Sequence, residues 1–194
     1  MPARDVMEEM AFGHARALPG PIHMRTGRSD APVGGKDATT MQTFLPYPDF
    51  AETARALDAK RLGNQRTEAL VIVRVCNIPT YGWQHHPAVR MWRGYEPALI
   101  AYGTAICEEW IAQGHADTVI AKLAEWAPGG EVRSQIELAA RGELPPWLGD
   151  ESVHRSHRSA LLRKNPEWYF GRFEADLPDD LPYVWPVENA PAGG

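Results

Sequence analysis

The sequence predicts an all-α fold, a single compact domain in which two long helices cross and shorter helices pack on them. Apolar residues recur with helical spacing over two long stretches, and helix caps and stops divide the chain into segments. No window of four or more residues alternates between apolar and polar as a strand would. With 194 residues, 44% hydrophobic and 23% charged, the composition is that of a globular protein and excludes a fibrous or wholly disordered chain.

The first forty residues differ from the rest of the chain. Glycines and prolines alternate through residues 1–40 and no apolar periodicity persists there, so we predict a flexible leader. A denser, aromatic-containing sequence begins at Met41, which is a candidate for the original start of translation. We predict one helical domain over residues 41–187 and a flexible tail over residues 188–194.

The first long helix is predicted from about residue 50 to residue 75. Asp49 stands three residues before Glu52, a pair that can satisfy the free backbone N–H groups of a first helical turn. Gly63 is a candidate point for a bend or interruption of this helix. The second long helix is predicted to begin at Pro87 and to end at Gly114, because proline suits the first helical position and glycine suits the position after the last turn.

Three shorter helices and an extended tail follow. The helices are predicted over residues 117–126, 131–141 and 150–164, the last ended by Asn165-Pro166. The acidic, proline-rich stretch after Phe173 is expected to wrap over the domain, docked to the core by Tyr183 and Trp185.

Cysteine content and hydropathy predict a cytoplasmic protein. The two cysteines, Cys76 and Cys107, do not form a disulfide framework, fit a reducing compartment and are expected to be buried thiols. The longest apolar run, residues 69–73, is far shorter than the roughly 18 residues of a membrane-spanning helix, and no signal pattern opens the chain. We therefore expect no membrane partner.

Charge is unevenly distributed along the chain, whose formal net charge is −5. Residues 53–93 hold seven basic and two acidic residues, and residues 154–172 hold five basic residues and one acid. Each run alone is typical of a solvated helix face. If the two runs lie together, they form one cationic face on an acidic protein, which favours nucleic-acid binding. Three tryptophans flank the runs and could stack on bases: Trp83, Trp92 and Trp168. Tryptophan is nevertheless more often a core residue.

Glu68 is the candidate catalytic residue. It ends the basic stretch 60–68 and directly precedes the apolar residues 69–72. A carboxylate in such a place is either the hub of structural salt bridges or a catalytic acid or base whose pKa the site controls. Composition alone favours the salt-bridge hub.

Two histidines three residues apart, His154 and His157, are expected on one helix face. With Glu68 and His86 they could form a four-ligand metal site, as in a metal-dependent hydrolase. A His-x-x-His pattern alone is weak support for a metal, and hydrogen bonding to phosphates or to Glu68 is favoured. No catalytic triad and no glycine-rich phosphate loop is visible, so we predict no metal and no cofactor.

From Met41 onward the chain resembles the pyrimidine dimer DNA glycosylases, small all-α phage repair enzymes often called endonuclease V. The resemblance covers roughly residues 41–170 and is spread over three stretches, 56–68, 85–115 and 145–169. The first resembles the family's helix segment that ends in its catalytic glutamate, here Glu68. The last resembles a helix and an aromatic turn that approaches DNA in the family.

The resemblance implies a glycosylase that excises damaged pyrimidines, with an associated abasic-site lyase activity. In that chemistry an amine attacks the anomeric carbon of the sugar, the base leaves, and a Schiff base permits strand cleavage by β-elimination. Glu68 would stabilise the cationic sugar and move protons. The partner would be double-stranded DNA containing damaged bases, sharply bent and bound by a monomer. Our candidates for DNA contacts are Arg61, which stands where the phage enzyme has a histidine, and Gln65, Arg66, His86, Arg155, His157, Arg158 and Lys164.

The nucleophile is where the chain departs from the family, which uses the α-amine of a small residue exposed by removal of the initiator methionine. Gln42 holds the corresponding position, but forty residues precede Met41, and glutamine is too large for routine removal of the methionine. Three alternatives are open: a later start or cleavage exposes the amine, Lys60 or another lysine replaces it, or Glu68 activates water and no Schiff base forms. A noncatalytic helical DNA-binding protein of the same fold is the competing hypothesis.

Overall fold

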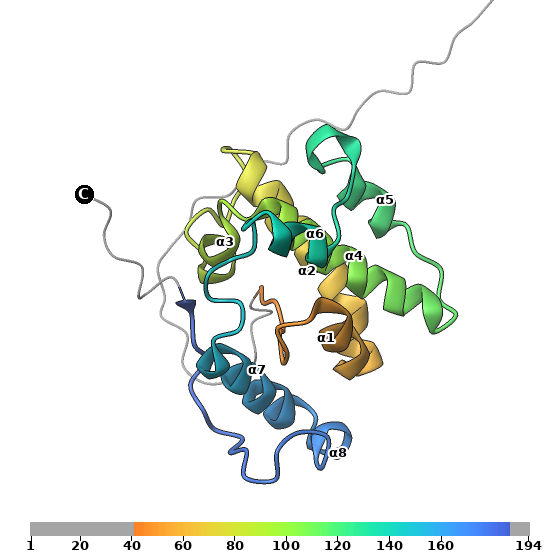
Figure 1. Ribbon diagram of the computed structural model, residues 1–194. Coiled ribbons are helices and arrows are strands. Elements are labelled where there is room, and N and C mark those ends of the chain that lie inside the picture. The colour runs from red at the N-terminus through yellow and green to blue at the C-terminus, as the bar shows by residue number, and fades with distance from the viewer. Residues whose placement is uncertain (1–40, 187–194) are drawn as a thin grey trace, which may run out of the picture. The chain divides into compact units, whose positions relative to one another are not determined.

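The computed structural model describes residues 41–186, in which it contains helices and no strand. This confirms the predicted all-α class (Figure 1). The predicted leader, residues 1–40, and the predicted tail, residues 188–194, lie outside the described residues. Among the described helices none is both long and apolar enough to cross a membrane. The helices are α1 (Phe50–Ala56), α2 (Ala59–Asn77), α3 (Pro87–Trp92), α4 (Glu96–Ala112), α5 (Val119–Ala124), the 3-10 helix η1 (Pro128–Gly130), α6 (Gln135–Ala140), α7 (Glu151–Lys164) and α8 (Pro166–Tyr169).

The first long helix is divided into α1 and α2, contrary to the prediction of one continuous helix. The break lies at Leu57 and Asp58, and Gly63 lies inside the unbroken α2. Asp58 is the N-cap of α2, since its side chain accepts hydrogen bonds from the backbone N–H groups of Lys60 and Arg61. A cap of this kind begins a new helix even where the apolar stripe continues.

The second long helix is also divided, into α3 and α4. Pro87 opens α3 as predicted, and the His86 side chain caps it by accepting from the backbone N–H of Ala88 at 3.1 Å. Gly94 separates the two helices with a φ of 86°, a conformation that favours glycine. The three shorter predicted helices are present as α5, α6 and α7, and α8 is an addition, because Pro166 opens a short helix as well as ending α7.

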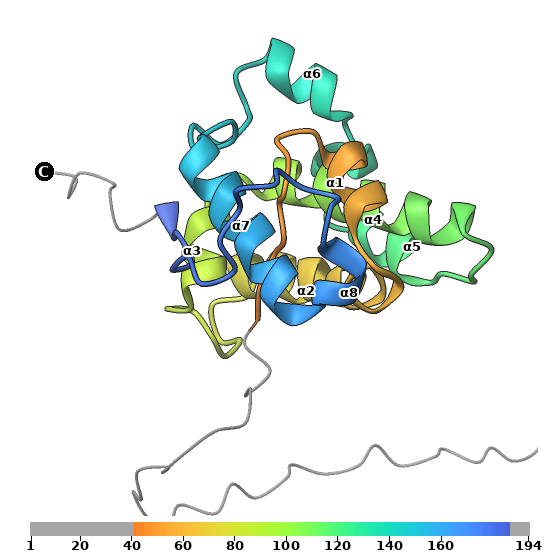
Figure 2. The same ribbon diagram turned by 90° about the horizontal axis from the view of Figure 1, so that it is seen from below.

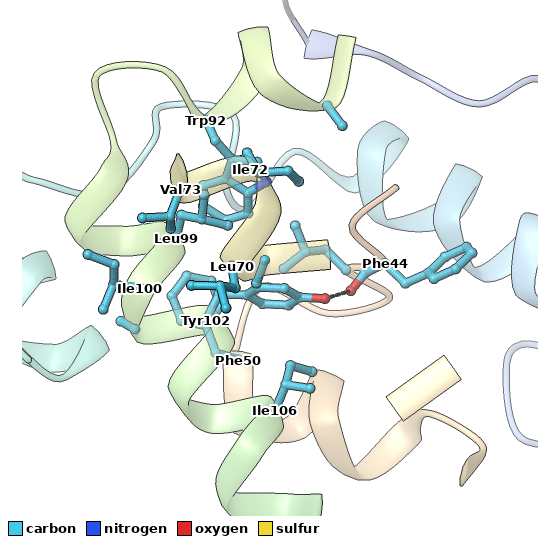
Figure 3. Packing of buried hydrophobic residues seen from close by; sticks show 14 of the residues in the cluster. Phe44, Phe50, Leu70, Ile72, Val73, Trp92, Leu99, Ile100, Tyr102 and Ile106 are labelled. Carbon is cyan, nitrogen blue, oxygen red and sulfur yellow. Dashed lines mark hydrogen bonds between the residues drawn. The ribbon is translucent and has the colours of Figure 1, made fainter. Parts of the chain in front are cut away.

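The core lies where α4 packs along α2, with α1 against α4 and α5 against both α2 and α4. Phe50, Trp92 and Tyr102 are fully buried there, and the Tyr102 ring centroid lies 5.7 Å from that of Phe50 and 5.8 Å from that of Trp92. Figure 3 shows these rings among the aliphatic side chains of α2 and α4. Trp92 is thus a core residue. Cys107 is buried as predicted, whereas Cys76 is only half-buried, and both are free thiols.

Gly103 marks a close approach between α4 and its neighbours α2 and α5. A Cβ at this position would lie 2.8 Å from Leu123 Cδ1 and 3.0 Å from Ala69 Cβ. We expect Gly103→Ala to lower the free energy of unfolding by about 1–3 kcal/mol, the usual cost of overpacking a core. Urea denaturation would measure the change. Gly82→Ala is the matched control, because nothing lies within 4 Å of a Cβ there, and an equal loss in both variants would contradict the prediction.

The segment before α1, residues 41–49, has no helical structure and passes between α7 and the pair formed by α2 and α4 (Figures 1 and 2). Among the described helices, α7 is in extensive contact only with α8. Its buried face, which includes Val153, His154 and His157, therefore packs largely on residues outside the helices. The functional candidates gather along this segment.

Candidate active site

Glu68 is a residue of α2, and its carboxylate contacts the beginning of the segment 41–49, which passes between α2 and α7. Its Oε2 accepts a hydrogen bond from the backbone N–H of Gln42 at 2.8 Å and another from the side-chain amide of Gln65 at 3.1 Å. The same Gln65 amide donates to the backbone carbonyl of Gln42 at 2.8 Å. Gln65 and Glu68 are three residues apart on α2 and share a face of that helix. The structure thus brings together the two predicted catalytic positions, Gln42 and Glu68.

Burial controls the protonation of Glu68. The side chain is half-buried, and this desolvation raises its pKa above the ordinary value. The hydrogen bonds from Gln42 and Gln65 and the positive charge of Lys164 oppose the rise. No salt bridge to Glu68 is found in residues 41–186. Within the described residues Glu68 is therefore not a salt-bridge hub, since the hydrogen-bond donors found there are neutral amides.

The two histidines of the His-x-x-His pattern hold one residue of the segment, Leu45. The Leu45 backbone N–H donates to Nδ1 of His157 at 2.8 Å, and the Leu45 carbonyl lies 2.8 Å from Nδ1 of His154. The other ring nitrogen of His154 accepts from the backbone N–H of Gly149 at 3.0 Å. Both histidines are therefore structural partners of the backbone, and neither contacts Glu68 through these bonds.

This geometry does not match the metal-site alternative. Both ring nitrogens of His154 are engaged by backbone groups, and no group of three or more metal-ligating residues comes together in residues 41–186. Burial lowers the pKa of His154 and places that of His157 well below its ordinary value, so both rings are neutral at pH 7. His86 instead caps α3.

Arg61 and Lys164 connect the beginning of α2 to the end of α7. The Arg61 guanidinium donates to the backbone carbonyl of Lys164 at 2.9 Å and pairs with Asp58 at 3.2 Å. Arg61, Gln65 and Glu68 lie on one face of α2, because residues four and seven positions apart are neighbours on a helix. The Lys164 side chain is exposed. Five predicted residues, Gln42, Arg61, Gln65, Glu68 and Lys164, therefore lie along the boundary between α2 and α7.

The other predicted arginines are engaged by acidic residues of the protein. Arg66 pairs with Asp117, and its guanidinium lies over the Trp110 ring, 4.3 Å from the centroid. Arg158 is buried and pairs with Glu151 and with Glu174, the latter at 2.9 Å. The remaining arginine, Arg155, pairs with Glu174 at 3.5 Å and Asp176 at 3.4 Å. Contacts of Arg66, Arg155 and Arg158 with DNA stay predictions.

Sequence reasoning missed two side chains that hold the segment. Tyr102 donates its hydroxyl to the Phe44 carbonyl at 3.0 Å, the bond drawn in Figure 3, and also contacts Gln65 Oε1 at 2.8 Å. Trp92 donates from its indole N–H to the Thr43 hydroxyl at 3.0 Å. Both lie within the predicted second long helix, where the sequence pattern indicates only an apolar face. The available signal was that tyrosine and tryptophan, when buried, nearly always find a hydrogen-bond partner.

A protein-family comparison matches part of the chain. Residues 41–122 match the family described as pyrimidine dimer DNA glycosylase, while no curated protein and no solved structure matches the chain. The match begins at Met41 and includes Gln42, Gln65 and Glu68. Together with the all-α fold, the match confirms the resemblance found in the sequence over residues 41–122, which are similar to the pyrimidine dimer DNA glycosylase family.

Proposed function

We propose that this protein is a DNA-repair glycosylase that excises pyrimidine dimers, with Glu68 as its catalytic carboxylate. The family match supports the glycosylase reaction. One observation supports the role of Glu68, the 2.8 Å distance between its Oε2 and the backbone nitrogen of Gln42. That nitrogen is the atom that would carry the α-amine if the chain began at residue 42.

Glu68 is suited to stabilise a sugar cation and to transfer protons. Breaking the bond between base and sugar leaves positive charge on the sugar, and a nearby carboxylate stabilises that charge. The half-buried position of Glu68 strengthens the interaction, because the effective dielectric there is lower than in water. The raised pKa makes the protonated form accessible closer to neutral pH, as a proton-transferring group requires.

An abasic-site lyase reaction needs a primary amine at the Gln42 position. In a chain that begins at Gln42, Glu68 takes a proton from the α-ammonium and the free amine attacks C1′ of the damaged nucleotide. The N-glycosidic bond breaks and its electron pair goes to the base, which gains a proton and stays joined to the other pyrimidine of the dimer, while the sugar ring opens to an imine. β-Elimination then expels the 3′ phosphate.

In a chain that continues before residue 42, the same nitrogen belongs to a peptide bond. Its lone pair is delocalised into the carbonyl, so it is not a nucleophile. For this form we propose that Glu68 activates a water molecule, which attacks C1′ and leaves an abasic site in an uncut strand.

The test compares chains that begin at Met1 and at residue 42, incubated with borohydride and duplex DNA that contains a cyclobutane dimer or an abasic site. Borohydride reduces an imine to a stable covalent adduct. We expect an adduct and strand cleavage from the chain that begins at residue 42. From the longer chain we expect cleavage of the N-glycosidic bond without an adduct, detected as an alkali-labile site in an uncut strand. A chain that begins at residue 42 with Gln42→Ser serves as a second short form, because an N-terminal glutamine can cyclise and lose its amine.

Two outcomes would contradict parts of the proposal. Salt-dependent DNA binding without cleavage of the N-glycosidic bond by any form would favour the noncatalytic DNA-binding protein. An adduct from the longer chain would show that another amine attacks C1′, either a lysine or the N-terminus of that chain. Lys164→Ala and Lys60→Ala would then identify it, and Lys164 is the cation whose charge acts on Glu68.

A further inference from the structure

The end of the described chain lies along α7 and beside the segment that carries Gln42. We call residues 181–185 the C-terminal strap. The backbone N–H of Leu181 donates to the Ser159 hydroxyl at 3.1 Å, and that of Val184 donates to the Ser156 hydroxyl at 3.1 Å. Both serines are buried on α7. The strap lies outside residues 41–122, the part of the chain that matches the family.

Tyr183 connects the strap to the segment beside Glu68. Its hydroxyl donates to the backbone carbonyl of Thr43 at 2.7 Å. Its ring stacks on His157 with centroids 4.2 Å apart, and the Trp185 ring centroid lies 4.5 Å from it. These contacts confirm that Tyr183 and Trp185 dock the tail. Burial raises the pKa of Tyr183 well above its ordinary value, so the hydroxyl remains a hydrogen-bond donor at neutral pH.

Two successive carbonyl groups of the segment are thereby fixed by side chains from different elements. Gln65 on α2 holds the carbonyl of Gln42, and Tyr183 in the strap holds the carbonyl of Thr43. These bonds fix the two peptide groups that follow the Gln42 Cα. They thereby limit the positions from which the Gln42 nitrogen, on the other side of that Cα, donates to Glu68.

We propose that Tyr183 is a positioning residue of the site, whose hydroxyl holds the Thr43 carbonyl and thereby keeps the Gln42 nitrogen on Glu68. Its catalytic consequence rests on the proposed function, whereas its effect on the Gln42 nitrogen does not. A displacement of about 1 Å in an active site can cost up to a hundredfold in rate. Removing the Tyr183 hydroxyl while its ring stays stacked on His157 should therefore lower the rate by less than a hundredfold.

The experiment compares Tyr183→Phe with the wild-type full chain. The variant keeps the ring and removes only the hydroxyl. We measure kcat and KM for excision of a cyclobutane dimer from duplex DNA, and the hydrogen-exchange rate of the Gln42 amide. We expect kcat to fall about tenfold with KM changed less than twofold, and exchange at Gln42 to become about tenfold faster. Tyr81→Phe is the matched control for removing a half-buried tyrosine hydroxyl, and exchange of the α4 amides monitors global stability.

The outcomes separate this inference from the proposed function. If the wild-type chain excises no dimer but Tyr183→Phe accelerates exchange at Gln42 alone, the proposed function fails and the positioning of the nitrogen by Tyr183 stands. If the wild-type chain is active and Tyr183→Phe leaves kcat and Gln42 exchange unchanged, the inference is overturned. Equal acceleration at Gln42 and in α4 would also overturn it, because the hydroxyl would then serve global stability only.

Discussion

Replacing Glu68 by glutamine is expected to lower the rate of dimer excision by about 10²–10⁴-fold, the usual contribution of an acid–base group, while DNA binding is retained. Glutamine is nearly isosteric with glutamate, and its carbonyl oxygen can still accept the hydrogen bond from the Gln42 N–H. The neutral amide cannot balance positive charge on the sugar or accept a proton. Single-turnover excision measures the rate, and fluorescence anisotropy measures binding.

Glu125→Gln is the control for Glu68→Gln, because it removes an exposed carboxylate at the end of α5. A Glu68→Gln rate within threefold of the wild-type rate would show that the carboxylate is not catalytic. The pH profile adds a second readout. Because burial raises the Glu68 pKa above its ordinary value of 4.5, activity that needs the carboxylate should begin to fall at a pH above 4.5 as the solution is acidified.

Stability is expected to fall steeply as the pH is lowered below about 6.5, because His154 and His157 resist protonation in the folded state. Burial lowers the pKa of both rings below the ordinary value of 6.5, and the unfolded chain therefore binds protons first. The stability that the neutral rings provide is complete above pH 6.5 and is lost below it. Each histidine contributes a limiting slope of about 1.4 kcal/mol per pH unit, so the pair contributes at most about 2.7.

Urea denaturation between pH 7.5 and pH 5.5 measures this slope. His157→Asn is expected to reduce it by about half, because the asparagine oxygen can accept from the Leu45 N–H and does not titrate. The Glu68→Gln background removes the opposite contribution of Glu68, whose raised pKa favours the folded state at acid pH. A slope that is identical with and without His157 would contradict the prediction.

The sequence predicts helices more reliably than the places where they break. The apolar stripe runs through Asp58, and the sequence pattern does not show that this residue caps a new helix. Gly94 lies inside the predicted second helix, but in the structure it has a positive φ and forms the turn between α3 and α4. The sequence pattern does not show that a turn is present there. Apolar periodicity reports which face is buried, whereas capping competes with it locally and decides where a helix begins.

Only part of the candidate site could be predicted from the sequence. Residues marked by their sequence neighbours were found, whereas contacts between residues far apart in the sequence were not. Glu68 was identified from its position between basic and apolar residues, and Gln42 from the family resemblance. The burial of Arg158 depends on Glu174, sixteen residues later in an acidic tail. The contact between Tyr183 and Thr43 joins positions 140 residues apart. Local patterns of charge and hydropathy contain no information on such pairs.

The segment between α2 and α7 also has a consequence for synthesis of the protein. Residues 42–45 leave the ribosome before their partners, because Leu45 needs His157, 112 residues later, and Thr43 needs Tyr183. Contacts of such large sequence separation form late in folding, since the intervening chain must first be closed into a loop. A nascent chain therefore cannot complete the geometry around Glu68 until Tyr183 has been synthesised, and products truncated before it should lack the assembled site even where α2 and α4 have formed.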